Sequence, residues 1–376
     1  MNLWTSKDAV KATNGISKIN WVADGISIDT RNIKPGDLFV ALKDKRDGHE
    51  FVKAAFEKGA SAALVSKVPD GVNENFPLLV VEDVFGALQS MAKFARARTK
   101  AKNIGVTGSV GKTSTKEMLK TILTENGKTH AAEKSYNNHW GVPLTLARMP
   151  KNSDFAIIEI GMNSPNEIRP LAKLAALDVA IVLNVAPVHL KAFKNVEEIA
   201  FAKAEIFENL TSKNSAIVNN DLSTTQILLK TVKAVGANLV TFGQKDKSDF
   251  RLVSSTWRKN KTSVKAKMND QNIHFDFCAE GDHFSMNALA AFAAAELVGA
   301  DRKITTQAFS NWQAPKGRGE RKKIKFGLGN IELIDESYNA NPISMAAALK
   351  VLSNSKSSGR KIAILGEMGE LGVKEN

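Results

Sequence analysis

Short apolar runs alternate with segments of helical periodicity between residues 103 and 243, and no other feature constrains the fold of this chain as strongly. The runs are NIGVTG (103–108), FAIIEIG (155–161), DVAIVLNV (178–185), SAIVNND (215–221) and NLVTFG (238–243). The segments between them predict helices over 112–127, 164–177, 196–210 and 223–235. Strands that alternate with helices form a mostly parallel sheet with helices on both faces. We therefore predict an α/β fold, with residues 251–277 appended as antiparallel hairpins and a further helix over 283–300.

The chain has 376 residues, more than one hydrophobic core usually serves, so we expect several domains. Three blocks are predicted, over residues 1–82, 83–314 and 315–376. The last block contains expected strands and a helix, at 323–328, 331–336, 343–355 (the helix) and 361–369. Because a lone strand–helix–strand start cannot bury both faces of a sheet, we expect this last domain to be unusually small or incomplete.

Composition narrows the class of protein. Apolar residues are 43% and charged residues 24% of the chain, as in a folded protein rather than a disordered one. The single cysteine, Cys278, excludes an internal disulfide framework and a multi-cysteine metal site. No apolar run is long enough to cross a bilayer, and Lys7 and Asp8 interrupt the N-terminus where a signal peptide is apolar. We expect a cytoplasmic protein with no membrane span.

The charge balance points to an anionic partner. Lys and Arg number 52 against 39 Asp and Glu, a net charge of +13, which favours nucleic acid or a phosphate-rich small molecule. The basic residues are spread over 93–102, 257–267 and 315–325, so most are expected to be solvated. No recognition helix or aromatic-rich platform accompanies them, and we expect no nucleic-acid partner.

The clearest chemical motif is GVTGSVGKTSTKEML (105–119), at a predicted strand-to-helix junction. Glycines there let backbone N–H groups wrap a phosphate, Lys112 adds a charge, and Thr113 can place its hydroxyl on Mg²⁺. The usual G-x-x-x-x-G-K-[ST] pattern would have Gly where Val106 stands, so this is a variant phosphate loop. The expected nucleotide-binding residues of the loop are Gly108, Ser109, Val110, Gly111, Lys112, Thr113 and Ser114. By itself the motif fits a kinase, an ATPase, a GTPase or an ATP-driven ligase equally well.

Three further residues are candidates for metal chemistry. Glu159 and His189 each follow a predicted strand, at the sheet edge where ligands gather in open α/β folds. Glu159 is either a Mg²⁺ ligand or an ordinary strand-end charge, and His189 either contacts metal or substrate or is structural. Lys203, in the apolar helix IAFAKAEIFENL, either extends its amine to solvent or reacts with CO₂ to form a carbamate, an anionic oxygen ligand.

Seven motifs together carry a resemblance to one family. They are SIDTRNIKPGDLFVALKDKRDGHEFV (27–52), YNNHWGVPLTL (136–146), EIGMN (159–163), NVAPVHLKAF (184–193), AKAEIF (202–207), IDESYNANPISM (334–345) and ILGEMGELG (364–372). With T-G-S-V-G-K-T as the phosphate loop, the chain resembles the Mur ligases, ATP-dependent amide-forming enzymes of peptidoglycan assembly. The resemblance implies three domains: a small α/β N-terminal domain for the UDP-sugar, a central P-loop domain for ATP, and a Rossmann-like C-terminal domain.

The resemblance also implies a reaction. D-alanyl-D-alanine would be joined to UDP-N-acetylmuramoyl-tripeptide through an acyl phosphate, giving the pentapeptide, ADP and phosphate. It implies ATP, two Mg²⁺ sites and a monomer, and it leaves open whether the third residue of the tripeptide is meso-diaminopimelate or lysine. Because the family normally continues through most of its last domain, we expect that domain to be incomplete here. A nucleotide- or UDP-sugar-binding protein without ligase turnover is therefore the alternative.

Site residues follow by motif match. The family places catalysis at Lys112, Glu159, His189 and Lys203, and metal at Thr113, Glu159, His189 and carbamylated Lys203. The UDP-sugar and substrate contacts would be Ser27, Thr30, Arg31, Asp47, Gly48, His49, Asn137 and Asn138. The nucleotide would also meet Asn287 on its adenine side, together with Arg318, Asp335 and Glu336. Ser164 and Asn166 stand where relatives usually have His and Gly, which leaves nearby substrate contacts open.

Overall fold

The computed structural model describes residues 2–73, 75–190, 192–327, 329–357 and 359–369. The chain forms two compact units, one of Met1–Ala101 with Ala132–Asp154 and the other of Lys102–Ala131 with Phe155–Asn376. The predicted division into three domains stays a prediction. Across the part of the chain that is described, no helix combines the length and the apolar character needed to span a bilayer.

The first unit is built on a four-stranded parallel sheet in the order β3-β4-β5-β6. Its strands are β3 (Gly25–Ser27), β4 (Asp37–Val40), β5 (Ala62–Val65) and β6 (Leu78–Val80), with a separate antiparallel pair, β1 (Trp4–Thr5) and β2 (Val22–Ala23). Its helices are α1 (Ser6–Thr13), η1 (Gly48–Phe51), α2 (Val52–Glu57), α3 (Val84–Ala97) and α5 (Gly141–Ala147). Successive strand residues point to opposite faces, so Leu38 and Val40 pack with α3 while Phe39 packs with Val52 of α2.

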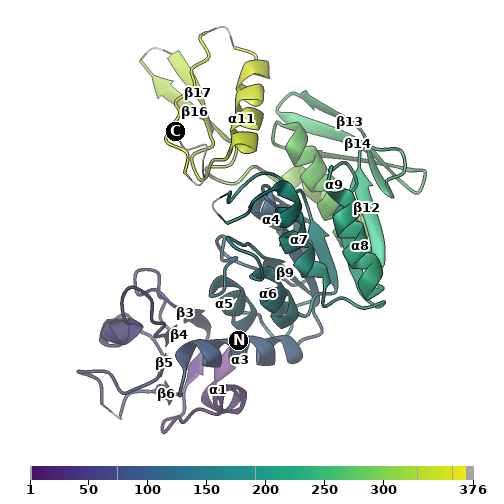
Figure 1. The fold of residues 1–376 in the computed structure, drawn as a ribbon. Coiled ribbons are helices and arrows are strands. Elements are labelled where there is room, and N and C mark those ends of the chain that lie inside the picture. Colours follow the sequence, from purple (N-terminus) through teal and green to yellow (C-terminus); the bar gives the residue numbers. More distant parts are fainter. Residues whose placement is uncertain (1, 74, 191, 328, 358, 370–376) are drawn as a thin grey trace. The chain divides into compact units, whose positions relative to one another are not determined.

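The second unit contains a nine-stranded sheet in the order β15-β14-β13-β12-β11-β10-β7-β9-β8 (Figure 1). Its strands are β7 (Lys102–Thr107), β8 (Thr129–Ala131), β9 (Phe155–Glu159), β10 (Val179–Val182), β11 (Ser215–Asn219), β12 (Asn238–Gly243), β13 (Phe250–Arg258), β14 (Lys261–Met268) and β15 (Gln271–Phe277). The six strands from β12 to β8 are parallel, and β13, β14 and β15 are joined as antiparallel hairpins. The predicted parallel sheet with appended hairpins is confirmed.

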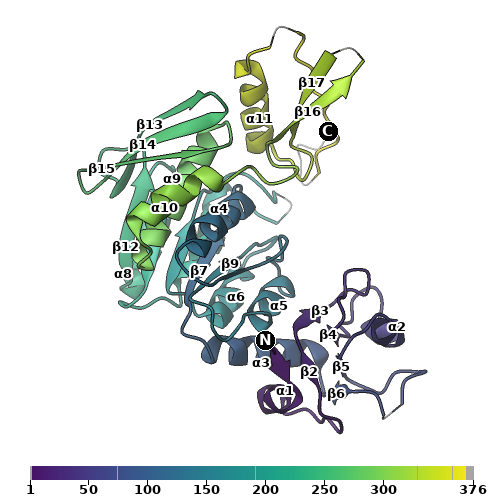
Figure 2. The ribbon, with the colours of Figure 1, turned by 180° about the vertical axis from the view of Figure 1, so that it is seen from behind.

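Helices cover both faces of this sheet. One face carries α4 (Lys112–Thr124), α9 (Asp282–Leu297) and α10 (Arg302–Ala308), which continues into η3 (Phe309–Asn311). The other carries α6 (Ile168–Ala175), α7 (Val196–Ala204) with η2 (Glu205–Phe207), and α8 (Thr225–Val235), as Figures 1 and 2 show from opposite sides. Such coverage buries the parallel strands on both faces, which explains why they read as continuous apolar runs.

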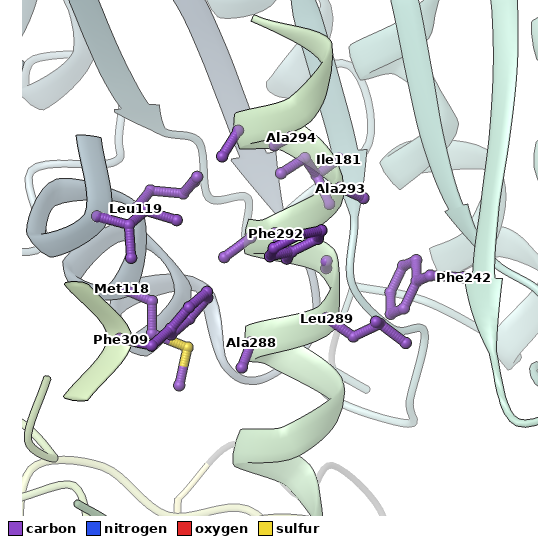
Figure 3. Packing of buried hydrophobic residues seen from close by; sticks show 14 of the residues in the cluster. Met118, Leu119, Ile181, Phe242, Ala288, Leu289, Phe292, Ala293, Ala294 and Phe309 are labelled. Atoms are coloured by element: carbon purple, nitrogen blue, oxygen red, sulfur yellow. The ribbon is translucent and has the colours of Figure 1, made fainter. Parts of the chain in front are cut away.

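Helix α9 is the centre of the main core. Every residue from Ala288 to Ala295 is fully buried, as expected for a helix that is apolar on all sides. Figure 3 shows Phe292 of this helix among Met118 and Leu119 of α4, with Phe242 of β12 nearby. The small alanines allow α9 to lie close to α4, and α4 begins directly after the phosphate loop. The packing of α9 against α4 therefore fixes the position of the helix that follows the phosphate loop.

Some predicted elements differ from the observed ones. The helix expected over 164–177 begins only at Ile168, because Asn166 adopts a left-handed conformation with a φ of 67°. The last block forms an antiparallel hairpin, β16 (Glu320–Phe326) with β17 (Gly329–Asp335), followed by α11 (Pro342–Asn354). The strand predicted over 361–369 is wrong: these residues pair with no described strand, and Ile364 is 94% exposed. The end of the ILGEMGELG motif lies outside the described residues.

Candidate active site

The phosphate loop runs from Gly108 to Gly111, between β7 and α4. Gly111 is the N-cap of α4 with a φ of 83°, and a Cβ built there would lie 2.7 Å from Asn287 Nδ2. At Gly108 a Cβ would lie 3.0 Å from Leu183 Cβ. Glycine is therefore needed at Gly111 both for its backbone conformation and for the close approach of α9. The N-terminus of α4 and the loop N–H groups form a site suited to an anion.

The loop is braced by residues that follow β10. Asn184 Oδ1 accepts a hydrogen bond from Val110 N at 2.9 Å, and Asn184 Nδ2 donates to Val110 O at 3.0 Å. Ser109 Oγ donates to Ala186 O at 3.1 Å and accepts from Ala186 N at 2.9 Å. The site residues assigned from the sequence do not include Asn184. The available signal was its place in NVAPVHLKAF, at the carboxyl end of a predicted strand.

Glu159 lies beside the loop because β9 pairs with β7 in a register that sets Val106 opposite Glu159. Thr113 Oγ1 donates to Glu159 Oε1 at 3.1 Å, and both side chains are buried. Lys112 Nζ donates to Gly108 O at 2.8 Å. Burial lowers the pKa of Lys112, and Arg318 lowers it further, while the charge of Glu159 opposes the change. The structure thus brings Lys112, Thr113 and Glu159 together.

Lys203 lies in the last turn of α7 and is 2% exposed. Burial lowers its pKa well below the ordinary value, and the charge of Lys112 lowers it further. Among the residues that the structure describes, no carboxylate forms an ion pair with Lys203. Lys112 and Arg318 therefore supply positive potential near Glu159, which suits an anionic ligand, whereas burial favours the neutral amine of Lys203.

His189 follows β10 with a φ of 56°, in the left-handed region. Histidine, like asparagine and aspartate, adopts this region more readily than most residues other than glycine. Within the described part of the chain, no group of three or more His, Cys, Asp or Glu side chains is arranged to hold a metal ion. The available oxygen donors, Thr113 and Glu159, nevertheless fit Mg²⁺, because that ion usually binds one or two protein oxygens together with substrate phosphates and water.

The remaining nucleotide-side residues are placed as follows. Asn287 is buried on α9 and faces Gly111, and Ser114 is buried on α4. The guanidinium of Arg318 lies 4.1 Å from the centre of the Tyr338 ring. Asp335 ends β17, and hydrogen bonds from Ser337 lower its pKa, whereas burial raises the pKa of Glu336 to about 7 against the opposing charge of Arg318.

A shallow cavity of about 580 Å³ extends this edge of the sheet. It is lined by Asn219, Asp221, Gln244, Lys245 and Met286, at the carboxyl ends of β11 and β12 and the start of α9. Met286 directly precedes Asn287, so the cavity adjoins the helix that faces the phosphate loop.

The predicted UDP-sugar residues all lie in the first unit, mostly beyond the carboxyl ends of β3 and β4. Ser27 Oγ donates to Asp29 O at 3.0 Å, and Thr30 O accepts from Lys58 Nζ at 2.9 Å. Arg31 is exposed and pairs with Asp29 at 2.7 Å, which lowers the pKa of Asp29 to about 2. This edge is where ligands bind in parallel sheets.

His49 points inward rather than toward solvent. Its Nε2 accepts the backbone N–H of Ser66 at 2.9 Å, so the ring proton must reside on Nδ1, which lies 2.6 Å from Asp47 Oδ1. A Cβ at Gly48 would lie 2.4 Å from Leu42 O, so only glycine fits there. These three residues form one turn packed against the ends of β4 and β5.

Asn137 and Asn138 precede α5 in the same unit. Asn138 Oδ1 accepts from Gly141 N at 2.9 Å and from Trp140 N at 3.3 Å, which caps the start of α5. At Gly141 a Cβ would lie 2.4 Å from the backbone of Tyr136, so the turn is tight.

Comparisons with known proteins identify the family of this chain. The family model of the Mur ligase middle domain matches residues 106–295, and that of the Mur ligase family catalytic domain matches residues 23–106. The UDP-N-acetylmuramoyl-tripeptide–D-alanyl-D-alanine ligase of Rickettsia prowazekii (strain Madrid E) is 34% identical over 372 residues, which cover 98% of this chain and 81% of that protein.

Solved structures are similar over nearly the whole chain. MurF from Acinetobacter baumannii is 29% identical, with a TM-score of 0.85 over 99% of this chain and 81% of that one. MurF ligase from Thermotoga maritima, solved in complex with ADP, is 27% identical, with a TM-score of 0.76 over 93% of this chain and 79% of that one. From its phosphate loop, its fold and these relationships, the chain belongs to the Mur ligase family.

Proposed function

We propose that this chain is an ATP-dependent ligase that joins D-alanyl-D-alanine to UDP-N-acetylmuramoyl-tripeptide, a step in the synthesis of peptidoglycan precursors. The products are the pentapeptide, ADP and phosphate. The names of its relatives support this reaction, and the ADP complex of the Thermotoga maritima protein supports the use of ATP. The observation that carries the proposal is the phosphate loop, where Lys112 and Arg318 supply positive potential near Glu159. The comparisons do not favour the alternative of nucleotide binding without turnover.

The residues address the chemical difficulty of the reaction. A carboxylate resists attack by an amine because its oxygens hold negative charge, so one oxygen is first phosphorylated to make a leaving group. The anionic peptide terminus must then approach an anionic triphosphate. In this proposal Lys112 would contact the β- and γ-phosphates, and the loop N–H groups would hold them in line. Arg318 would add charge on the nucleotide side and help to exclude water that would hydrolyse the acyl phosphate.

Two Mg²⁺ ions are part of the proposal. When bound, Mg²⁺ neutralises phosphate charge, and Thr113 Oγ1 and Glu159 are the donors that would hold one ion. The second would be held by His189 and Lys203 as a carbamate. The lowered pKa of Lys203 favours its neutral amine, which can attack CO₂ to form an N–C bond and release a proton. The resulting anion would also offset the nearby charge of Lys112.

Substrate contacts complete the proposal. The residues proposed for the UDP-sugar and peptide are Ser27, Thr30, Arg31, Asp47, Gly48, His49, Asn137 and Asn138. Asn287 would lie at the adenine, and Asp335 and Glu336 near the ribose or phosphates. We further propose that the protein is a cytoplasmic monomer.

Phosphate release by the purified chain tests the proposed reaction. Release from ATP should require both UDP-N-acetylmuramoyl-tripeptide and D-alanyl-D-alanine, and the pentapeptide should appear in equal amount by mass spectrometry. Turnover that is indifferent to the dipeptide would refute the proposal. The substitution Lys203→Ala should abolish activity, and addition of a small carboxylic acid should restore part of it. Lys233→Ala, at an exposed position in the last turn of α8, should leave activity unchanged.

A further inference from the structure

Glu205 connects the segment that carries Lys203 to the loop that follows Glu159. It is the first residue of η2, two positions after Lys203, and its side chain is 4% exposed. Its Oε1 accepts from Asn166 N at 2.7 Å, and its Oε2 accepts from Arg169 N at 2.9 Å. Each carboxylate oxygen therefore holds one backbone N–H of a segment that lies 36 or 39 residues earlier in the chain.

The position of these donors explains why a carboxylate lies there. Arg169 is in the first turn of α6, where N–H groups have no partner within the helix. The N-cap residue of α6, Glu167, makes no side-chain capping bond. Glu205 supplies that cap from another segment, and its negative charge is favourable at the positive end of the helix.

The loop between β9 and α6 is consequently held at both ends. At its start, Ile160 N donates to Val106 O at 2.9 Å, which continues the pairing of β9 with β7 beyond Glu159. At its other end, Glu205 holds residues 166–169. An exposed pair between Arg169 and Glu208 joins the same two segments at the surface.

We infer that Glu205 is a positioning residue, which sets the spacing between Glu159 and Lys203 by clamping the loop after β9 to the end of α7. This inference rests on the proposed function, in which those two side chains hold the two metal ions. Glu205 itself contacts backbone N–H groups rather than substrate. Residues that orient a metal-binding side chain from behind typically change metal affinity or activity by about 10–100-fold when replaced.

The test compares Glu205→Gln with Glu208→Gln. The glutamine at position 205 preserves side-chain volume, but its NH₂ group would face one of the two N–H donors. We expect kcat to fall about 10-fold or more and the Mg²⁺ concentration for half-maximal rate to rise, with the KM for ATP changed less than about threefold. Glu208→Gln, which alters an exposed pair, should change each value by less than about twofold.

Amide hydrogen exchange provides a readout that does not depend on turnover. Peptides spanning residues 160–170 should exchange faster in Glu205→Gln than in the parent or in Glu208→Gln, while peptides from α9 remain protected. Unchanged exchange in 160–170, or equal kinetic losses in the two variants, would overturn the inference. If the parent chain shows no ligase turnover, the proposed function fails, and the exchange experiment still decides whether Glu205 holds the loop.

Discussion

Replacing Gly111 with alanine should weaken ADP binding more than its effect on the unfolding free energy would explain. Gly111 has a φ of 83°, and an L-residue in the left-handed region costs about 1–2 kcal/mol. A Cβ there would also lie 2.7 Å from Nδ2 and 2.9 Å from Oδ1 of Asn287. Because the Asn287 amide ends a flexible side chain, it can move away, but only by leaving its place beside the phosphate loop.

Gly236 offers a matched control in the same unit. It is the C-cap of α8 with a φ of 70°, and no atom lies within 4 Å of its built Cβ. Gly236→Ala therefore carries the backbone penalty without the collision. Both variants should lose about 1–2 kcal/mol of unfolding free energy in urea. Only Gly111→Ala should weaken ADP binding, by about 10-fold or more in calorimetry, which corresponds to about 1.4 kcal/mol.

A double variant isolates the cause. If the collision with Asn287 weakens binding, then Gly111→Ala in an Asn287→Ala background should cost little more than Asn287→Ala alone. The reasoning is refuted if Gly111→Ala binds ADP as tightly as the parent chain while losing as much stability as Gly236→Ala. Full additivity in the double variant would refute the role of Asn287 specifically.

Three further outcomes are expected. Thr113→Val should lower the unfolding free energy by about 1 kcal/mol, because the hydrogen bond to Glu159 is lost, and it should reduce turnover strongly. Thr115→Val is the control and should change stability and turnover little, because the buried Thr115 hydroxyl has no hydrogen-bond partner among the described residues. Gly48→Ala should lower the unfolding free energy by about 1–3 kcal/mol, because its Cβ would meet the backbone of residues 41 and 42, and calorimetry should show weaker UDP-sugar binding. The pKa of Glu336 is raised from 4.5 to about 7, so the folded state binds the extra proton and stability falls as pH rises through that window. Glu336→Gln should flatten this slope in urea unfolding, and an unchanged slope would contradict the assignment.

The phosphate loop and the parallel sheet could be predicted because their signals are local. Two glycines, a lysine and a threonine lie within six residues at one strand-to-helix junction. Apolar runs that alternate with helices specify a doubly covered sheet, since parallel strands buried on both faces need apolar residues at nearly every position. The two strands that lead to Lys112 and Glu159 are parallel, so both residues lie at or beyond strand ends at the same edge of the sheet. That edge is where ligands bind in open α/β sheets.

The bracing contacts could not be predicted in this way. Asn184 is 74 residues from Val110, and Glu205 is 39 residues from Asn166, so their pairing depends on which segments the sheet order brings together. The inward hydrogen bonds of His49 and the late start of α6 at Ile168 depend on the same packing. The wrong strand over 361–369 shows the limit of a local pattern, because a strand needs a hydrogen-bonding neighbour.

The sequence alone therefore determined the class of fold, the phosphate loop and the family. Each of these depends on short stretches of consecutive residues with characteristic spacing. The tertiary structure decided which polar side chains hold the loops around that site and which point into the protein. The physical reason is that backbone preference and apolar periodicity act over a few residues. The partner of a buried polar group, in contrast, is chosen only when distant segments pack and leave that group one way to form its hydrogen bonds.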